Sequence, residues 1–140
     1  MTNLRPPHPD ALFVALALAP NTYSRNKFFD MFTQKVLFTA RRRAELIRGI
    51  VRDLSGPPPE VPGGQPPQIL EETRTHDGLR LVYRMPDLEY RRTALLSPLE
   101  AAVLEYSLSR VGVRTLAPES ESQIRKALSG FEQELELSTP

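Results

Sequence analysis

The chain lacks cysteine and tryptophan altogether and has only two histidines among its 140 residues. Without cysteine it can form neither a disulfide scaffold nor the common thiolate sites for zinc or iron–sulfur clusters. Its longest apolar run, residues 11–19, has nine residues, far below the roughly 20 that a membrane-spanning helix needs. The run is also a poor signal peptide, because Asp10 precedes it and Pro20 follows it. We therefore expect a cytoplasmic protein with no membrane span, no bound metal and no cofactor.

Length and charge set the next limits. A chain of this size can bury one real core but not two. Residues 1–54 carry nine Lys/Arg and four Asp/Glu, whereas residues 55–140 carry nine Lys/Arg and thirteen Asp/Glu. This asymmetry indicates either an acidic or nucleic-acid partner for the basic half, or attraction between the two halves of one domain.

The N-terminal part reads as a loose arm, an apolar segment and a long helix. Residues 1–10 contain three prolines and should form the arm. The apolar residues 11–19 should form a buried strand or a short helix. Residues 22–54 are free of proline, and their apolar side chains recur with helical period. That stripe comprises Phe28, Phe29, Phe32, Val36, Ala40, Ala44, Ile47, Val51 and Leu54. Because 33 helical residues extend about 50 Å, we expect either a break near residues 39–43 or an end that projects.

The C-terminal part follows a linker. Six prolines and three glycines in residues 55–67 exclude a helix or a sheet interior. The residue pattern of 69–86 predicts a hairpin with its turn at His76-Asp77-Gly78, and residues 87–96 should add a third strand. In the second strand Leu79, Leu81, Tyr83 and Met85 should face one side, and Arg80, Val82 and Arg84 the other.

Two helices should end the chain. Ser97, Pro98 and Glu100 form a capping box that starts a mostly apolar helix, which runs to about residue 111 before Gly112. A second helix is expected over about residues 119–137. The predicted fold is α+β and helix-rich: one long amphipathic N-terminal helix, a small antiparallel hairpin or three-stranded sheet, and two C-terminal helices. We divide it into 1–54, the linker 55–67 and 68–140, with 11–54 and 68–140 forming one folded unit.

Three consecutive arginines lie within the long helix. Arg43 falls at the edge of the apolar stripe, where its stem can cover the core while its head reaches water. Arg41 instead shares a face with Arg48 and Arg52, and Glu45 lies beside them. This face can be a solvated surface with an Arg41–Glu45 pair, a contact for an acidic protein surface, or a contact for nucleic acid.

Apolar residues overflow the stripe between residues 28 and 40. Met31 and Phe38 lie off it, on the side near the arginines, so a second surface should cover them. The candidates are the apolar segment 11–19, another subunit or a partner protein. We favour a partner or a homo-oligomer, and we predict an interaction surface made of Met31, Phe38, Arg41, Arg48 and Arg52.

The sequence contains no clear catalytic or metal-binding motif. His8 and His76 have no second ligand at metal-binding spacing. Asp77 or Asp87 followed by Glu89 and Arg91 resembles the restriction-endonuclease-like core, in which an acid and a Glu-x-Lys motif on adjacent strands hold Mg²⁺. Here arginine replaces the lysine, and a guanidinium that stays protonated cannot act as a base.

The sequence therefore favours a small non-enzymatic interaction module: an adaptor, a regulator or a subunit of a larger assembly. A nucleic-acid-binding regulator that uses the Arg41/Arg48/Arg52 face is the second hypothesis. A nuclease dependent on a divalent metal, using Asp77, Asp87 and Glu89, is the third.

Overall fold

The computed structural model describes residues 8–18, 34–55, 66–85 and 91–129 of the chain. The described elements are helices α1 (Pro9–Leu18), α4 (Gln34–Leu54), α5 (Pro98–Arg110) and α6 (Pro118–Leu128), and strands β1 (Gln68–Thr75), β2 (Gly78–Arg84) and β3 (Arg91–Leu96). The prediction of a helix-rich α+β fold with a three-stranded antiparallel sheet and two C-terminal helices is confirmed.

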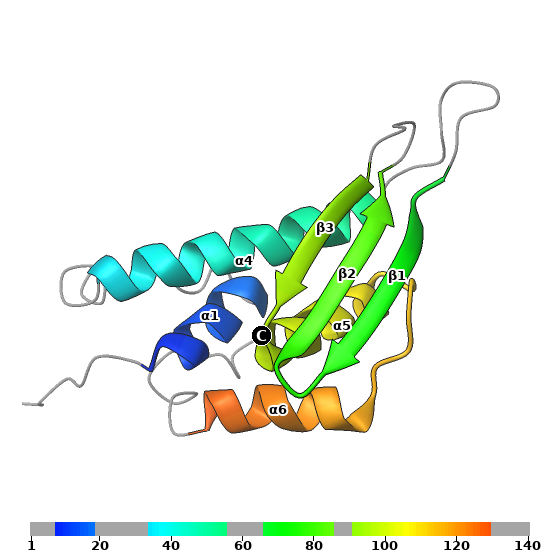
Figure 1. The fold of residues 1–140 in the computed structure, drawn as a ribbon. Coiled ribbons are helices and arrows are strands. Elements are labelled where there is room, and N and C mark those ends of the chain that lie inside the picture. The colour runs from blue at the N-terminus through cyan, green and yellow to red at the C-terminus, as the bar shows by residue number, and fades with distance from the viewer. Residues whose placement is uncertain (1–7, 19–33, 56–65, 86–90, 130–140) are drawn as a thin grey trace, which may run out of the picture.

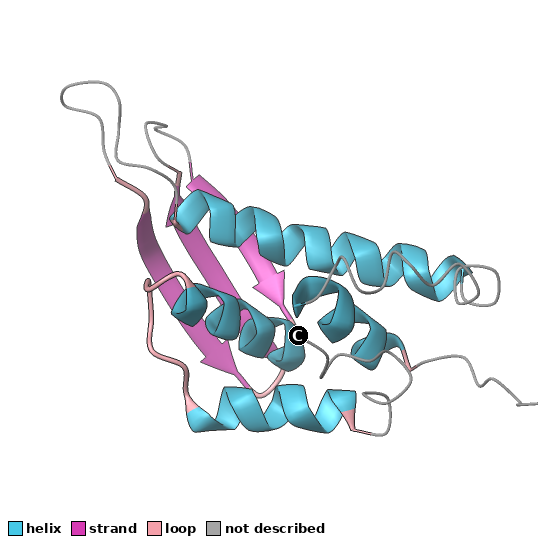
Figure 2. Ribbon diagram, turned by 180° about the vertical axis from the view of Figure 1, so that it is seen from behind, coloured by secondary structure: helices cyan, strands magenta, loops and turns pink. Residues whose placement is uncertain are grey.

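The elements form two layers. The strands make an antiparallel sheet in the order β1-β2-β3, and α4 and α5 lie on one of its faces (Figures 1 and 2). Helix α1 packs against α4, α5 and α6 beyond the β3 side of the sheet. The other face of the sheet is not covered by any described element.

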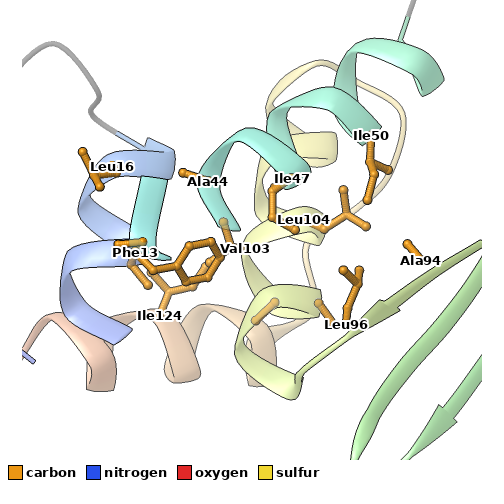
Figure 3. Packing of buried hydrophobic residues seen from close by; sticks show 14 of the residues in the cluster. Phe13, Leu16, Ala44, Ile47, Ile50, Ala94, Leu96, Val103, Leu104 and Ile124 are labelled. Carbon is orange, nitrogen blue, oxygen red and sulfur yellow. The ribbon is translucent and has the colours of Figure 1, made fainter. Parts of the chain in front are cut away.

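One hydrophobic core joins elements from both sides of the proline-rich segment. Figure 3 shows its side chains converging from four helices and from β3. They include Phe13 and Leu16 of α1, Ala44, Ile47 and Ile50 of α4, Ala94 and Leu96 of β3, Val103 and Leu104 of α5, and Ile124 of α6. Helix α1 is apolar nearly all round, and all of its residues from Ala11 to Leu16 are buried, as expected of a helix that is enclosed by other elements.

The structure corrects three expectations about the helices. The apolar run forms a helix that starts at Pro9, so the arm is shorter than predicted. Helix α4 continues unbroken from Gln34 to Leu54, so the first of the two alternatives, a break near residues 39–43, is wrong. Ala40 and Ala44 are buried in the core, so the apolar stripe of the helix continues through this segment. Residues 19–33 lie outside the described part, as does the linker segment 56–65. Helix α6 ends at Leu128 rather than near residue 137, with Ser129 as its C-cap.

Local sequence signals position α5. Ser97 Oγ accepts a hydrogen bond from the Glu100 amide at 3.2 Å, and Glu100 Oε1 accepts one from the Ser97 amide at 2.8 Å. This is the predicted capping box, with Pro98 in the first turn. Gly112 follows the C-cap with φ of 80°, the left-handed conformation that glycine adopts at no steric cost.

The hairpin also follows its sequence. Thr75 pairs with Gly78 around a turn of two residues, His76 and Asp77. Leu79, Leu81 and Tyr83 are buried in the core as predicted, and Arg80 is exposed. Val82, on the opposite face, is only 7% exposed. Its burial was not expected and is consistent with cover from the long side chains beside it on β2.

Candidate interaction surfaces

Helix α4 presents an exposed face that mixes apolar and charged side chains. Phe38 is 62% exposed and Leu46 is 45% exposed, and the two lie on the same side of the helix. Arg42 lies between them, with its guanidinium 5.6 Å from the centroid of the Phe38 ring. Arg41 and Glu45 are also exposed on this side. We call these five residues the α4 outer face.

The predicted arginine stripe is divided between two environments. Arg41 and Arg52 are exposed, but Arg48 is half-buried and its Nε donates to the Ala44 carbonyl of its own helix at 3.4 Å. Arg48 lines a hollow of about 270 Å³ with Leu18 of α1 and with Tyr106 and Arg110 of α5, among others. The Arg41–Glu45 pair expected from the sequence is absent from the ion pairs of the described residues. Met31 lies outside the described part of the chain.

Arg43 has a structural role that the sequence did not reveal. We expected its head only to reach water, but its side chain is 21% exposed and its guanidinium pairs with two acids: Nη1 bonds to Asp10 of α1 and Nε bonds to Glu100 of α5, each at 3.1 Å. The guanidinium also lies 4.1 Å from the centroid of the Phe13 ring. Arg43 therefore ties α1, α4 and the start of α5 together. The pairing depends on three segments far apart in the sequence, and periodicity carries no signal for it.

A second polar cluster joins the end of α4 to the sheet. The Tyr83 hydroxyl donates to Asp53 Oδ2 at 2.8 Å, and Arg92 Nη1 approaches the same oxygen at 3.5 Å. Burial, followed by the hydrogen bond to Asp53, raises the pKa of Tyr83 to about 12. The residue is 2% exposed, so the protonated phenol is the form that fits this site.

Ion pairs also connect the inner side of β1 to α5 and to the segment after α5. Arg114 forms two hydrogen bonds with Glu72, and the one from Nη2 measures 2.6 Å. Hydrogen bonding to Arg114 lowers the pKa of Glu72, although burial acts in the opposite direction. Nearby, the buried Glu105 of α5 pairs with Arg74 and accepts a hydrogen bond from Ser120. These contacts close the β1 edge against α5 and the segment that leads to α6.

The described residues contain no group of three or more His, Asp or Glu side chains that could hold a metal ion. Asp77 occupies the turn before β2, while the segment that contains Asp87 and Glu89 follows the other end of that strand and is not described. The seven residues of β2 span about 20 Å. Asp77 is thus far from where that segment begins. His76 and Asp77 lie 3.2 Å apart, but both side chains are almost fully exposed.

A hollow of about 690 Å³ lies beside Arg43. His8, Lys126 and Gln123 line it, together with Arg43 and Asp10. Arg43 and Asp10 already bond to each other there, and His8 Nδ1 accepts the Asp10 amide at 3.1 Å. Arg43, Asp10 and His8 of this hollow therefore already have hydrogen-bond partners.

The open face of the sheet carries a regular grid of side chains. Its rows, read across β1, β2 and β3, are Gln68–Arg84–Arg91, Glu71–Val82–Thr93 and Thr73–Arg80–Leu95. Arg80 pairs with Glu71 at 3.3 Å, and Arg84 donates to Gln68 at 2.9 Å. Arg84 Nε is buried without a hydrogen-bond partner. Leu95 is 74% exposed, an unusual position for leucine in a strand. From the sequence we predicted only that Arg80, Val82 and Arg84 share this face of β2.

No helix among the described residues is long and apolar enough to cross a membrane. Comparison of the chain with protein-family models, with curated proteins and with solved structures found no match.

Proposed function

We propose that the protein is a non-enzymatic interaction module, and that the α4 outer face binds a partner protein through an acidic segment with apolar anchors. The observation that carries the proposal is the exposure of Phe38 and Leu46 on a helix whose opposite side contributes to the hydrophobic core. The two side chains lie eight residues apart, about 12 Å along the helix. This spacing suits two anchor side chains from a single partner helix.

The charges beside these anchors favour an acidic partner. Arg41 and Arg42 flank Phe38, and Glu45 is the one acid of the α4 outer face. The Arg42 guanidinium stacks near the Phe38 ring, where it can meet a carboxylate while the ring meets an apolar side chain. Gly49 continues this side of the helix by one turn, and a Cβ added there would meet nothing within 4 Å. A partner backbone can therefore approach closely.

The arrangement suits nucleic acid less well. Arg41 and Arg52 lie about 16 Å apart along the helix, with Glu45 between them. Arg48, the third member of the predicted stripe, is half-buried and turned toward α5. Exposed apolar anchors such as Phe38 favour a protein contact over phosphate binding, which depends on cationic side chains.

The test compares matched variants in binding to a purified partner. Wild-type protein first captures partners from its host, and each one is then purified and titrated with Phe38→Asp, Leu46→Asp and the control Val113→Asp. Val113 is also a large exposed apolar residue, at 41%, but it lies in the segment after α5. We expect the two α4 variants to weaken binding at least about tenfold and the control to bind like wild type.

Circular dichroism must show all three variants folded. Binding that is unchanged in Phe38→Asp and Leu46→Asp would contradict the proposal. A nucleic-acid ligand whose affinity falls steeply with salt and ignores Phe38→Asp would favour the second hypothesis instead.

A further inference from the structure

Strand β3 is an open edge of the sheet. The strand order places β1 and β3 at the two edges, and α4 crosses β3 on the inner side of the sheet rather than beside it (Figures 1 and 2). Among the described residues, no backbone hydrogen bond outside the sheet involves residues 91–96. An edge of this kind can pair with another chain.

The hydrogen-bond pattern identifies the free groups. The two-residue turn makes Thr75–Gly78 a hydrogen-bonded pair, and such pairs alternate along antiparallel strands. Leu79, Leu81 and Tyr83 therefore direct their amides toward β3. Their partners Leu96, Ala94 and Arg92 direct theirs back toward β2. The amides and carbonyls of Arg91, Thr93 and Leu95 consequently point away from the sheet.

The two edges differ in how they are protected. Strand β1 has a register shift between Ile69 and Glu71, and the Arg114–Glu72 contact lies against it. Irregularities and charges of this kind block edge pairing. Strand β3 pairs with β2 in unbroken register over all six residues and contains no proline. It therefore offers a regular template for one further strand.

We propose that β3 is a docking edge for an extended segment of a partner protein, which adds to the sheet as a fourth, antiparallel strand. The side chains of β3 on the open face define the chemistry of that segment. A residue opposite Arg91 continues a row that already contains Arg84, so it should be acidic. A residue opposite Leu95 should be apolar, because it can cover a side chain that is 74% exposed.

These positions specify a motif. Opposite Thr93, a β-branched residue suits the pleated surface. Because the added strand is antiparallel, its residues read apolar, any, β-branched, any, acidic from the N-terminal to the C-terminal side. The nine grid positions of the open face include no aromatic residue, so the stacking platform that RNA-binding sheets use is absent. A second copy of the chain fits less well, since it would bring another basic open face to the same edge.

The probe is a synthetic fluorescein-labelled peptide, Ser-Leu-Thr-Val-Thr-Glu-Ser, titrated into the full chain and followed by anisotropy. A control peptide has lysine in place of the glutamate. We expect the glutamate peptide to bind with a Kd below about 1 mM and the lysine peptide to bind at least about tenfold more weakly. Arg91→Glu should reverse this preference. That reversal requires direct contact and cannot arise from a general loss of stability.

Two further variants test the backbone and the apolar contact. Thr93→Pro removes an amide that points away from β2, so it should abolish binding without breaking the β2–β3 ladder. Leu95→Ser should weaken binding, and Leu70→Ser, which changes an exposed leucine on the opposite edge, should not.

Three results would overturn the proposal. The first is no binding of the glutamate peptide up to about 1 mM. The second is binding that Arg91→Glu and Leu95→Ser leave unchanged. The third is a homodimer in light scattering that Thr93→Pro dissolves, because the occupant of the edge would then be a second copy.

Discussion

Glu100 takes part both in the N-terminal cap of α5 and in the contact by which Arg43 joins α1, α4 and α5. The contribution of each role to stability can be tested. Its Oε1 accepts the Ser97 amide at 2.8 Å, and its Oε2 accepts Arg43 Nε at 3.1 Å. Its side chain is 13% exposed and that of Arg43 is 21% exposed. This pair should therefore be worth more than an exposed ion pair, which contributes about 0–1 kcal/mol, and less than its unscreened attraction, because desolvation offsets part of it.

The two roles can be separated by two substitutions. Glu100→Gln keeps an oxygen for the Ser97 amide but removes the charge that faces Arg43, so we expect a loss of about 1–2 kcal/mol in the free energy of unfolding. Glu100→Ala also removes the bond to the cap and leaves Arg43 Nε without its acceptor. We expect that variant to lose about 2–4 kcal/mol. Asp10→Asn should cost under about 1 kcal/mol, since the Asp10 side chain is 45% exposed.

Urea unfolding followed by far-ultraviolet circular dichroism measures these differences, because the chain has no tryptophan to report by fluorescence. A double-mutant cycle of Arg43→Met with Glu100→Gln should give a coupling energy of about 1 kcal/mol. Equal losses for Glu100→Gln and Glu100→Ala would show that the cap bond contributes nothing. A coupling energy near zero would refute the role of Arg43 as a junction.

Three further predictions concern the hairpin and α4. The raised pKa of Tyr83, about 12 against 10 in the unfolded chain, means that its protonated hydroxyl stabilises the fold below pH 10 and that this stabilisation is lost as the pH rises toward 12. Tyr83→Phe should remove this loss of stability at alkaline pH. Absorbance near 295 nm should no longer show the one phenol that titrates late in the wild type. A titration curve unchanged from the wild type would argue against the Asp53 contact. Gly78→Ala should destabilise the fold by more than about 2 kcal/mol, because φ is +142° and the added Cβ collides with the Leu96 carbonyl. Gly49→Ala, with open space around it, should stabilise the fold by up to about 1 kcal/mol, and similar effects at both sites would contradict this reasoning.

Local signals predicted the parts of the fold that depend on neighbouring residues. The capping box at Ser97, the turn before Gly78 and the inward side of β2 each involve residues a few positions apart, and all three are present. Whether the run 11–19 is helix or strand stayed open, because a short apolar run carries no period that distinguishes them. Its packing against α4, α5 and α6 determines that it is a helix.

The candidate surfaces were harder to predict for the same reason. The sequence identified Phe38 as lying off the apolar stripe, and it is exposed. It grouped Arg48 with Arg41 and Arg52, because a helical wheel does not show that Tyr106 and Arg110 lie beside Arg48. Leu95 looks like an ordinary core residue in sequence. Only the register with β2 and the empty side of the sheet reveal that it faces outward.

The enclosure of α1 also constrains how the chain folds as it is synthesised. Residues 11–16 emerge from the ribosome before the rest of the core, and α5 and α6, which cover part of this helix, follow more than about 80 residues later. At roughly 5–20 residues per second, Leu12, Phe13 and Val14 wait several seconds for those partners. During that interval α4 can shield one side of α1, while the rest of its apolar surface is available to a chaperone or to another nascent chain. Solubility during synthesis should therefore depend on the time that α6 takes to arrive more than on the final stability of the fold.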